Sequence, residues 1–165
     1  MSITDSARRV VLIDRHLLDT VSAEACANVR RRKHHNFHTG DTALSHRLLN
    51  AIEPDSYVAP HRHLDAEKDE TMIVLRGQLG IVIFADDGSV VETHRLEAGG
   101  SCGITIPHGV FHAVLALQQG TVIFESKAGP YLPLTATEKA AWAPGEGEPG
   151  CETYARSLLT RFLRR

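Results

Sequence analysis

The chain has 165 residues, of which 42% are hydrophobic and 23% charged, so it is long enough for one globular domain with a sizeable core. Its formal net charge of −2 at pH 7 gives no global electrostatic reason to bind nucleic acid or an anionic membrane. Three cysteines, without a Cys-x-x-Cys pair, indicate neither a disulfide framework nor a thiolate metal site, and we expect a cytoplasmic protein.

The N-terminal segment, about residues 1–44, is expected to be a helical arm. Residues 1–14 lack the apolar stretch of a signal peptide, and no segment has the roughly 18 uninterrupted apolar residues of a membrane span. Apolar residues recur at helical spacing from Asp14, a candidate N-cap, to about Arg32, which predicts one helix or two short helices that break near Ser22. We interpret the basic cluster at residues 30–35 as a solvated helix end, where cations interact favourably with the macrodipole. An anionic-ligand patch is the alternative.

The central segment, residues 45–127, is expected to form a jelly-roll barrel. Its short apolar runs have strand composition and are separated by turns that contain Gly or Pro. Short strands at this spacing are typical of an antiparallel jelly roll. The predicted strands are residues 45–52, 57–63, 70–77, 77–84, 90–96, 102–106, 112–117 and 121–126.

The C-terminal segment, residues 128–165, is expected to be a loop followed by a helix. Residues 137–142 are a short helix candidate, and residues 144–150 have loop composition. Residues 152–163 recover helical periodicity, and their apolar stripe is expected to dock on the barrel or on a second subunit. A homodimer would cover both this stripe and the exposed edges of a jelly roll. We expect the whole chain, residues 1–165, to be a single domain.

Three histidines and one glutamate carry the strongest chemical signal in the chain. His61 and His63 are two apart, so they would point to one face of a strand, and pairing with the next strand would place Glu70 beside them. His112 opens a further strand after a Pro-x-Gly turn. Imidazole nitrogen and carboxylate oxygen are ligands that first-row divalent metals accept. If the four side chains converge, they predict a site for one divalent ion, with Fe, Mn, Ni, Zn and Cu all open.

These residues resemble the two motifs of the cupin superfamily. The motifs are Gly-x5-His-x-His-x(3,4)-Glu-x6-Gly and Gly-x5-Pro-x-Gly-x2-His-x3-Asn, and the resemblance implies a mainly β fold, the cupin double-stranded β-helix or RmlC-like jelly roll. It assigns the metal to His61, His63, Glu70 and His112. The sequence departs from the motifs at three positions that are not ligands in the family. These are Asp55 for the first Gly, Ala116 for the Asn, and Gly100, which stands one residue too far from Pro107.

The motif spacing leaves the carboxylate ligand ambiguous. Counting from the histidines selects Glu67, whereas counting back from Gly77 selects Glu70. We favour Glu70, because the strand that runs to Gly77 fixes its side-chain register, while residues 64–69 have the composition of a charged turn. Glu67 remains the alternative.

A longer series of segments resembles the WbuC-family cupin-fold metalloproteins and spans most of the chain from about Ile13 onward. That family often lies in bacterial surface-polysaccharide gene clusters, and its reaction is not established. The resemblance therefore implies a role in such metabolism more readily than a substrate. The segments are residues 47–50, 53–54, 57–63, 74–77, 84–88, 106–112, 125–131 and 142–144.

Four protein ligands leave an octahedral ion two open positions, which permits Lewis-acid polarisation, activation of bound water or oxygen chemistry. We therefore expect a metalloprotein that acts on or binds a small oxygen-rich molecule, with an activity like that of sugar isomerases and epimerases or of dioxygenases. The alternatives are a non-catalytic sugar- or metal-binding module, and a metal-free cupin whose histidines bind the substrate directly. The candidate pocket residues are Tyr57, Met72, His38 and Arg47.

Overall fold

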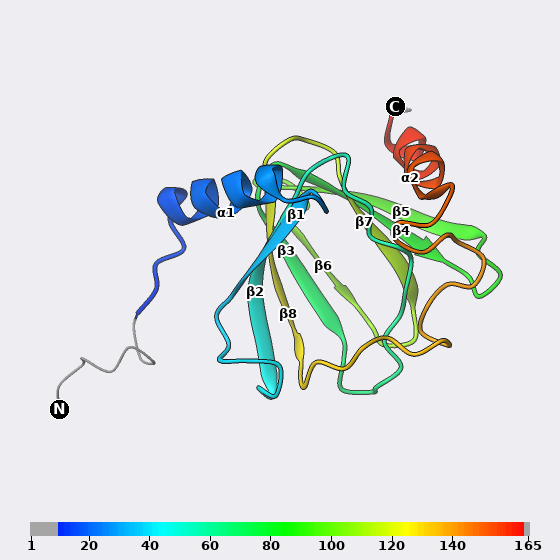
Figure 1. The fold of residues 1–165 in the computed structure, drawn as a ribbon, viewed down its shortest axis with the longest axis horizontal. Coiled ribbons are helices and arrows are strands. Elements are labelled where there is room, and N and C mark those ends of the chain that lie inside the picture. The colour runs from blue at the N-terminus through cyan, green and yellow to red at the C-terminus, as the bar shows by residue number, and fades with distance from the viewer. Residues whose placement is uncertain (1–9, 164–165) are drawn as a thin grey trace.

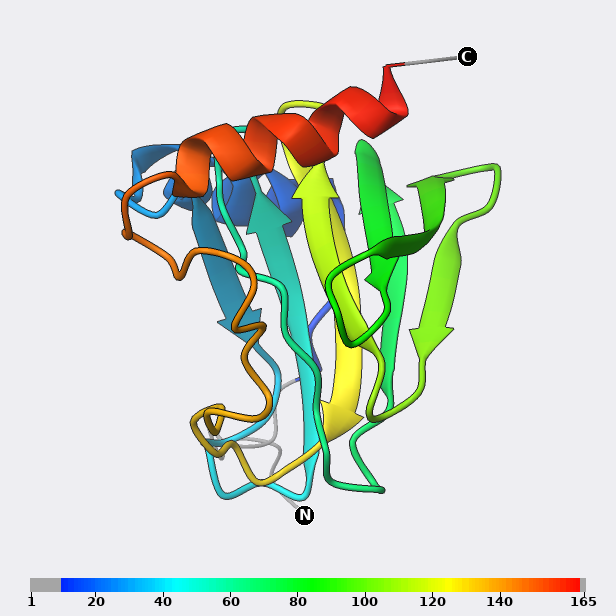
Figure 2. The same ribbon diagram turned by 90° about the vertical axis from the view of Figure 1, so that its right-hand side faces the viewer.

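The fold is that of a computed structural model, which describes residues 10–163. Within this range eight strands form two antiparallel sheets. The strands are β1 (Arg32–Asn36), β2 (Ser45–Ile52), β3 (Glu70–Arg76), β4 (Gln78–Phe84), β5 (Val90–Glu97), β6 (Gly103–Ile106), β7 (Phe111–Ala116) and β8 (Thr121–Ala128). Their order is β1-β2-β8-β3-β6 in one sheet and β5-β4-β7 in the other (Figures 1 and 2). The mainly β architecture predicted from the sequence is confirmed.

Hydrophobic side chains fill the space between the two sheets. Ile52, Val74 and Ile123 enter it from the five-stranded sheet, and Leu79 and Ile81 enter it from β4 of the three-stranded sheet. Burying an aliphatic side chain of this size contributes about 1.5–3 kcal/mol, so this layer holds the sheets together. Further along the same inward faces of β2, β3 and β8, polar residues replace the hydrophobic ones, and the candidate site lies there.

Two helices cover the outer faces of the sheets. Helix α1 (Arg15–Ala27) packs Val21 and Ala25 on the five-stranded sheet, and Asp14 caps it by accepting a hydrogen bond from the Leu17 amide at 2.9 Å. Helix α2 (Cys151–Leu159) and the 3-10 turn that follows it pack Leu158 and Phe162 on the three-stranded sheet. The two helices therefore lie on opposite sides of the sandwich (Figure 1). The apolar stripe of the C-terminal helix therefore packs on the barrel, which is one of the two predicted alternatives, the other being a second subunit.

Two predicted helices differ from the structure. Helix α1 ends at Ala27 instead of near Arg32, and the chain turns at Arg31, whose φ is 56°, so that β1 can pair with the edge of β2. The segment predicted as a helical arm therefore contains a strand. The predicted helix at residues 137–142 is a series of turns, because the Glu138 carboxylate accepts the amides of Thr135 and Leu64 and so ties this segment to a neighbouring loop.

The remaining predicted strands agree with the structure to within two residues at each end, apart from residues 57–63. Residues 1–9 and 164–165, which belong to the predicted arm and C-terminal helix, lie outside the described range. Within residues 10–163, none of the helices has the length and apolar character that a membrane crossing requires.

Candidate metal centre

Residues 57–63 carry two of the predicted ligands but do not form the predicted strand. One antiparallel bridge pairs His61 with His112 of β7: each backbone amide donates to the carbonyl of the other residue, at 3.0 and 2.9 Å. A second antiparallel bridge pairs His61 with Lys139. The predicted pairing with the strand that begins at Glu70 is wrong, because β3 pairs with β6 and β8. Pro60 has no amide hydrogen, so it cannot extend a ladder of strand hydrogen bonds. His61, the next residue, pairs instead with the free edge of β7.

Glu70 approaches the histidines from the opposite sheet. It begins β3 in the five-stranded sheet, whereas His61 and His112 lie along the edge of the three-stranded sheet. Glu70 and His112 are each only 2% exposed, and Nε2 of His112 lies 3.0 Å from Oε2 of Glu70. Nε2 of His63 lies 3.4 Å from Oε1 of the same carboxylate. The structure thus brings the four residues together between the sheets.

The alternative carboxylate, Glu67, is not part of this cluster. One candidate ligand atom each from His61, His63 and Glu70 lies within 4.8 Å of the other two. Glu67 is exposed in the turn before β3, where its amide donates to the Asp65 carboxylate at 3.0 Å. The geometry therefore places Glu70, and not Glu67, beside the imidazoles.

The hydrogen bonds of the histidines determine where their protons are. Nδ1 of His61 lies 3.0 Å from the Ala59 carbonyl, and Nδ1 of His112 lies 3.0 Å from the Val110 carbonyl. A carbonyl oxygen can only accept, so both Nδ1 atoms carry the proton and both Nε2 atoms are bare in the neutral rings. This is the arrangement in which a metal-ligating histidine donates its second nitrogen to a backbone carbonyl.

The donor atoms of the cluster are buried and lack partners. Among the described residues, Nε2 of His63, Nε2 of His112 and Oε2 of Glu70 have no hydrogen-bond partner. Two lone pairs that face each other at 3.0 Å repel unless a proton or a metal ion lies between them, and buried polar atoms without partners are costly. The donor set of three imidazoles and one carboxylate therefore fits a divalent transition metal.

Burial and charge keep the cluster in the protonation state that a metal requires. Burial, reinforced by the neighbouring His112, lowers the pKa of His61 to about 3. Burial acts to raise the pKa of Glu70, but the close imidazoles and the Lys127 ammonium outweigh it and hold that pKa well below its usual range. At pH 7 the imidazole of His61 is therefore neutral and the carboxylate of Glu70 is ionised, which are the forms that bind metals.

Lys127 and Glu125 extend the cluster along β8, and neither was predicted as a site residue. Nζ of Lys127 lies 2.5 Å from Oε1 of Glu70 and 2.8 Å from Oε1 of Glu125. Burial acts to lower the pKa of Lys127, but these two carboxylates raise it above its usual value, so the ammonium stays charged. Glu125 and Lys127 are two apart and share one face of β8, but the predicted strand ends at residue 126 and does not include Lys127.

A cavity of about 260 Å³ opens beside the cluster. Apart from the four predicted ligands, its wall combines basic, acidic and neutral polar residues with apolar ones. The polar residues are Arg30, Arg32, His34, His46, Asn50, Lys68, Glu125 and Lys127. A wall of this kind suits a small ligand rich in oxygen atoms.

Of the predicted pocket residues, Met72 lines the cavity and Tyr57 does not. The Tyr57 hydroxyl donates to the Pro144 carbonyl at 2.7 Å, and its ring meets Tyr154 of α2. The reason is that residues 57–63 lack the regular strand that would have aimed Tyr57 and His61 to the same side. Tyr57 thus fastens the C-terminal segment instead of lining the cavity.

The other two predicted pocket residues also lie outside the cavity wall. Arg47 points to the exposed face of β2, since inward and outward positions alternate along a strand and the preceding residue, His46, is buried. His38 stacks on His46 with 4.0 Å between the ring centroids, and its Nδ1 lies 3.2 Å from the Arg47 backbone nitrogen. Of these three residues, His46 is the one that lines the cavity.

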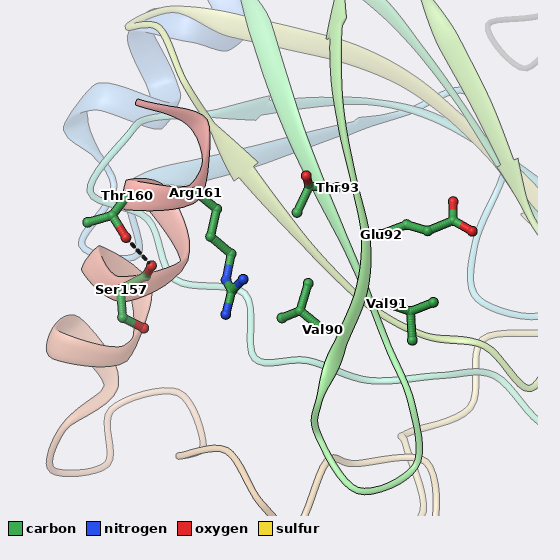
Figure 3. A pocket seen from close by; sticks show the side chains of 7 residues that line it. All are labelled: Val90, Val91, Glu92, Thr93, Ser157, Thr160 and Arg161. Atoms are coloured by element: carbon green, nitrogen blue, oxygen red, sulfur yellow. Dashed lines mark hydrogen bonds between the residues drawn. The ribbon is translucent and has the colours of Figure 1, made fainter. Parts of the chain in front are cut away.

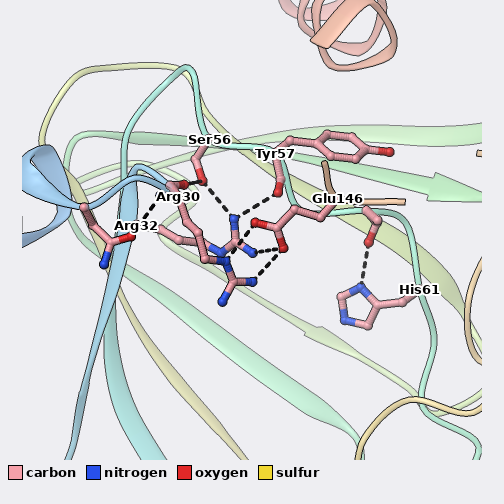
Figure 4. Close-up of polar contacts among 8 residues, drawn as sticks. Arg30, Arg32, Ser56, Tyr57, His61 and Glu146 are labelled. Atoms are coloured by element: carbon pink, nitrogen blue, oxygen red, sulfur yellow. Dashed lines mark hydrogen bonds and ion pairs between the residues drawn. The ribbon is translucent and has the colours of Figure 1, made fainter. Parts of the chain in front are cut away.

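The basic cluster at residues 30–35 is only in part what the sequence indicated. Arg32 belongs to β1 and lines the cavity, so the interpretation as a solvated helix end is wrong for this residue. Arg30 also lines the cavity, but its side chain is exposed to solvent. The guanidinium groups of both arginines bind one carboxylate, that of Glu146, through contacts of 2.6 to 2.8 Å (Figure 4). The hydrogen bonds from Arg30, together with Arg32 and against the effect of burial, lower the pKa of Glu146 to about 2.

Residues 13–96 match the family described as "Domain of unknown function (DUF6016)". The chain belongs to this family. A comparison of the DUF6016 chain with curated proteins gives no match.

Solved structures resemble the DUF6016 chain at low sequence identity. The conserved protein of unknown function SPY1581 from Streptococcus pyogenes has a TM-score of 0.52 and 15% identity over 80% of this chain and 98% of that one. Protein SO0799 from Shewanella oneidensis has a TM-score of 0.50 and 18% identity, over 64% of this chain and 72% of that one. The cupin domain of Cnp3 from Schizosaccharomyces pombe has a TM-score of 0.47 and 10% identity, over 60% of this chain and 65% of that one. These similarities concern the fold alone, and they agree with the mainly β fold of two antiparallel sheets.

Proposed function

We propose that the chain is a single cupin domain that binds one divalent transition metal through His61, His63, Glu70 and His112. The observation that carries the proposal is the set of buried donor atoms without partners, Nε2 of His63 and His112 and Oε2 of Glu70. Neutral imidazoles and an ionised carboxylate suit Fe, Mn, Ni or Zn, among which the donor set does not choose. Backbone carbonyls hold two of the imidazoles in the tautomer that leaves Nε2 free.

We further propose that the protein acts on a small oxygen-rich molecule in the adjoining cavity. A bound divalent ion would supply Lewis acidity next to that cavity. The cavity of about 260 Å³ limits the ligand to a small molecule, and its polar wall can hydrogen-bond several oxygen atoms. The resemblance to WbuC-family proteins supports a role in surface-polysaccharide metabolism, and the cysteine content favours a cytoplasmic setting for it.

The test is a turnover screen on protein of known metal content. Protein loaded with iron, manganese, nickel or zinc is compared with metal-free protein on panels of sugars and keto acids, and elemental analysis gives the occupancy. We expect about one ion per chain and metal-dependent conversion of at least one compound. Occupied protein that converts nothing would favour a non-catalytic binding module, and protein that takes up no metal would contradict the proposed site.

We propose a homodimer as the assembly. Strand β5 is paired on one side only within the described range, and Val91 on it is 60% exposed. A second cavity of about 540 Å³ lies between β5 and α2 and is lined by both elements (Figure 3). A second copy that adds its own β5 would cover this free edge. Light scattering at micromolar concentration is expected to give the dimer mass, and a clean monomer mass would contradict the proposal.

A further inference from the structure

Lys68 is a buried lysine in the cavity wall without an acidic partner. It is 8% exposed, and its ammonium donates to the Pro130 carbonyl at 2.9 Å. Among the described residues no carboxylate lies within 4.0 Å of it, in contrast to Lys127 in the same wall. An ammonium has three hydrogen atoms to donate, so two remain available. A buried charge is costly unless it is paired, which points to an anionic partner that comes from outside the chain.

The charge of the whole cavity wall favours the same kind of partner. The basic lining residues are Arg30, Arg32, Lys68 and Lys127. The carboxylates are those of Glu70 and Glu125 in the lining and of Glu146, which the two arginines contact. Four basic groups against three acidic ones leave one positive charge unbalanced, and a divalent ion would add two more. A concave wall with an excess of positive charge attracts small anions.

A neutral polar group lies in the same wall. The side-chain nitrogen of Asn50 donates to the Glu125 carboxylate at 3.4 Å, and Oδ1 of Asn50 is buried with no partner among the described residues. An amide oxygen accepts hydrogen bonds, and a ligand hydroxyl is a donor that would fit it. The cavity therefore offers one group for an anion and one for a hydroxyl, beside the donor cluster.

We propose that the cavity binds a small hydroxylated molecule with an anionic oxygen group, a carboxylate or a phosphate, and that Lys68 is the residue that binds this group. The proposal rests on the proposed function, because the ligand lies beside the metal ligands. Lys68 contacts the anionic end of this ligand, and Oδ1 of Asn50 accepts a hydrogen bond from one of its hydroxyl groups. Other oxygen atoms of the ligand face the imidazoles. Neutral sugars of the same size lack the charge that Lys68 requires.

The test uses three probes built on one carbon frame: glycerol, D-glycerate and glycerol 3-phosphate. Calorimetry on metal-loaded wild-type protein is expected to show that at least one of the anions binds at least about tenfold tighter than glycerol, about 1.4 kcal/mol. Whether glycerate or glycerol 3-phosphate binds tighter assigns the anionic group. Equal affinity for glycerol and both anions, or no binding of any probe, would overturn the proposal, and this comparison requires no variant.

Variants then assign the effect to Lys68. Lys68→Met is expected to lower the affinity for the anion about tenfold, so that the anion no longer binds tighter than glycerol. Lys68→Arg keeps the charge and is expected to retain the preference for the anion. The matched control is Lys33→Met, which removes an exposed lysine outside the cavity wall. If Lys68→Met and Lys33→Met bind the anion equally well, Lys68 does not have this role. Melting temperatures show whether each variant is folded.

The metal content of each sample separates this inference from the proposed function. Full occupancy without any preference for an anion would contradict the role of Lys68 and leave the metal site standing. A preference for the anion in protein that takes up no metal would support the role of Lys68 and contradict the metal site. The calorimetry is therefore run on both metal-loaded and metal-free protein.

Discussion

Replacing His61 and His63 together with alanine is expected to reduce the bound metal from about one ion per chain to background. Each of the two side chains contributes one imidazole nitrogen, and the variant would keep only His112 and Glu70 as ligands. The fold should persist, because the bridge between His61 and His112 uses backbone amides and carbonyls that alanine also has. Elemental analysis of the purified variant measures the result.

The matched control removes two histidines from the surface. His16 is exposed, and the side chain of His94 is 41% exposed and contacts Glu92. The variant with His16→Ala and His94→Ala is expected to bind as much metal as the wild type. Full occupancy of the His61 and His63 variant would refute the metal assignment, and equal losses in both variants would indicate a general effect of removing histidines.

The sequence predicted strand β3 and its inward face well, because one physical pattern sets both. Along β3 the positions of Glu70, Met72 and Val74 alternate with more exposed ones, and this alternation is readable in the residue types. The predicted register therefore aimed Glu70 into the barrel, where the structure has it. In contrast, the strand partner of β3 depends on contacts distant in sequence, and local patterns do not contain that information.

The prediction for residues 57–63 placed the histidines beside Glu70 correctly, although the strand on which it was based does not form. The spacing of His61 and His63 suggested a strand paired with β3, but Pro60 interrupts the chain and His61 pairs with His112. Glu70 still lies beside these histidines, because the two sheets face each other across the site. The motif spacing was informative about which residues meet, and not about which sheet supplies them.

The basic residues of the cavity could not be found from periodicity alone. Strand β8 is covered on both faces: Val122 packs under α1, while Ile123 faces the second sheet. The strand therefore shows no clear contrast between an apolar and a polar face, and the inward direction of Lys127 is hidden. Arg32 is first interpreted as part of a solvated helix end, because local patterns do not show that the residues after α1 pair with the edge of β2.

Replacing Glu70 with glutamine is expected to weaken metal binding by at least about tenfold, or 1.4 kcal/mol. Glutamine keeps the shape of the side chain but removes the one negative charge among the four proposed ligands, and carboxylate ligation depends on the ionised form. Lys127 keeps its contact with Glu125 at 2.8 Å, so its ammonium is not left without a carboxylate. Competition with a chelator at fixed pH and salt measures the affinity.

Glu67→Gln is the matched variant, since it makes the same chemical change three positions earlier in the chain. Glu67 is exposed in the turn before β3, so its replacement is expected to change the affinity by less than about threefold, as for a surface charge. Melting of both variants without metal shows whether either change acts through folding. If Glu67→Gln weakens the metal more than Glu70→Gln does, the chain follows the spacing counted from the histidines. In that case the carboxylate of Glu70 would form an ion pair with Lys127 without binding the metal. The turn before β3 would have to fold inward when the metal binds.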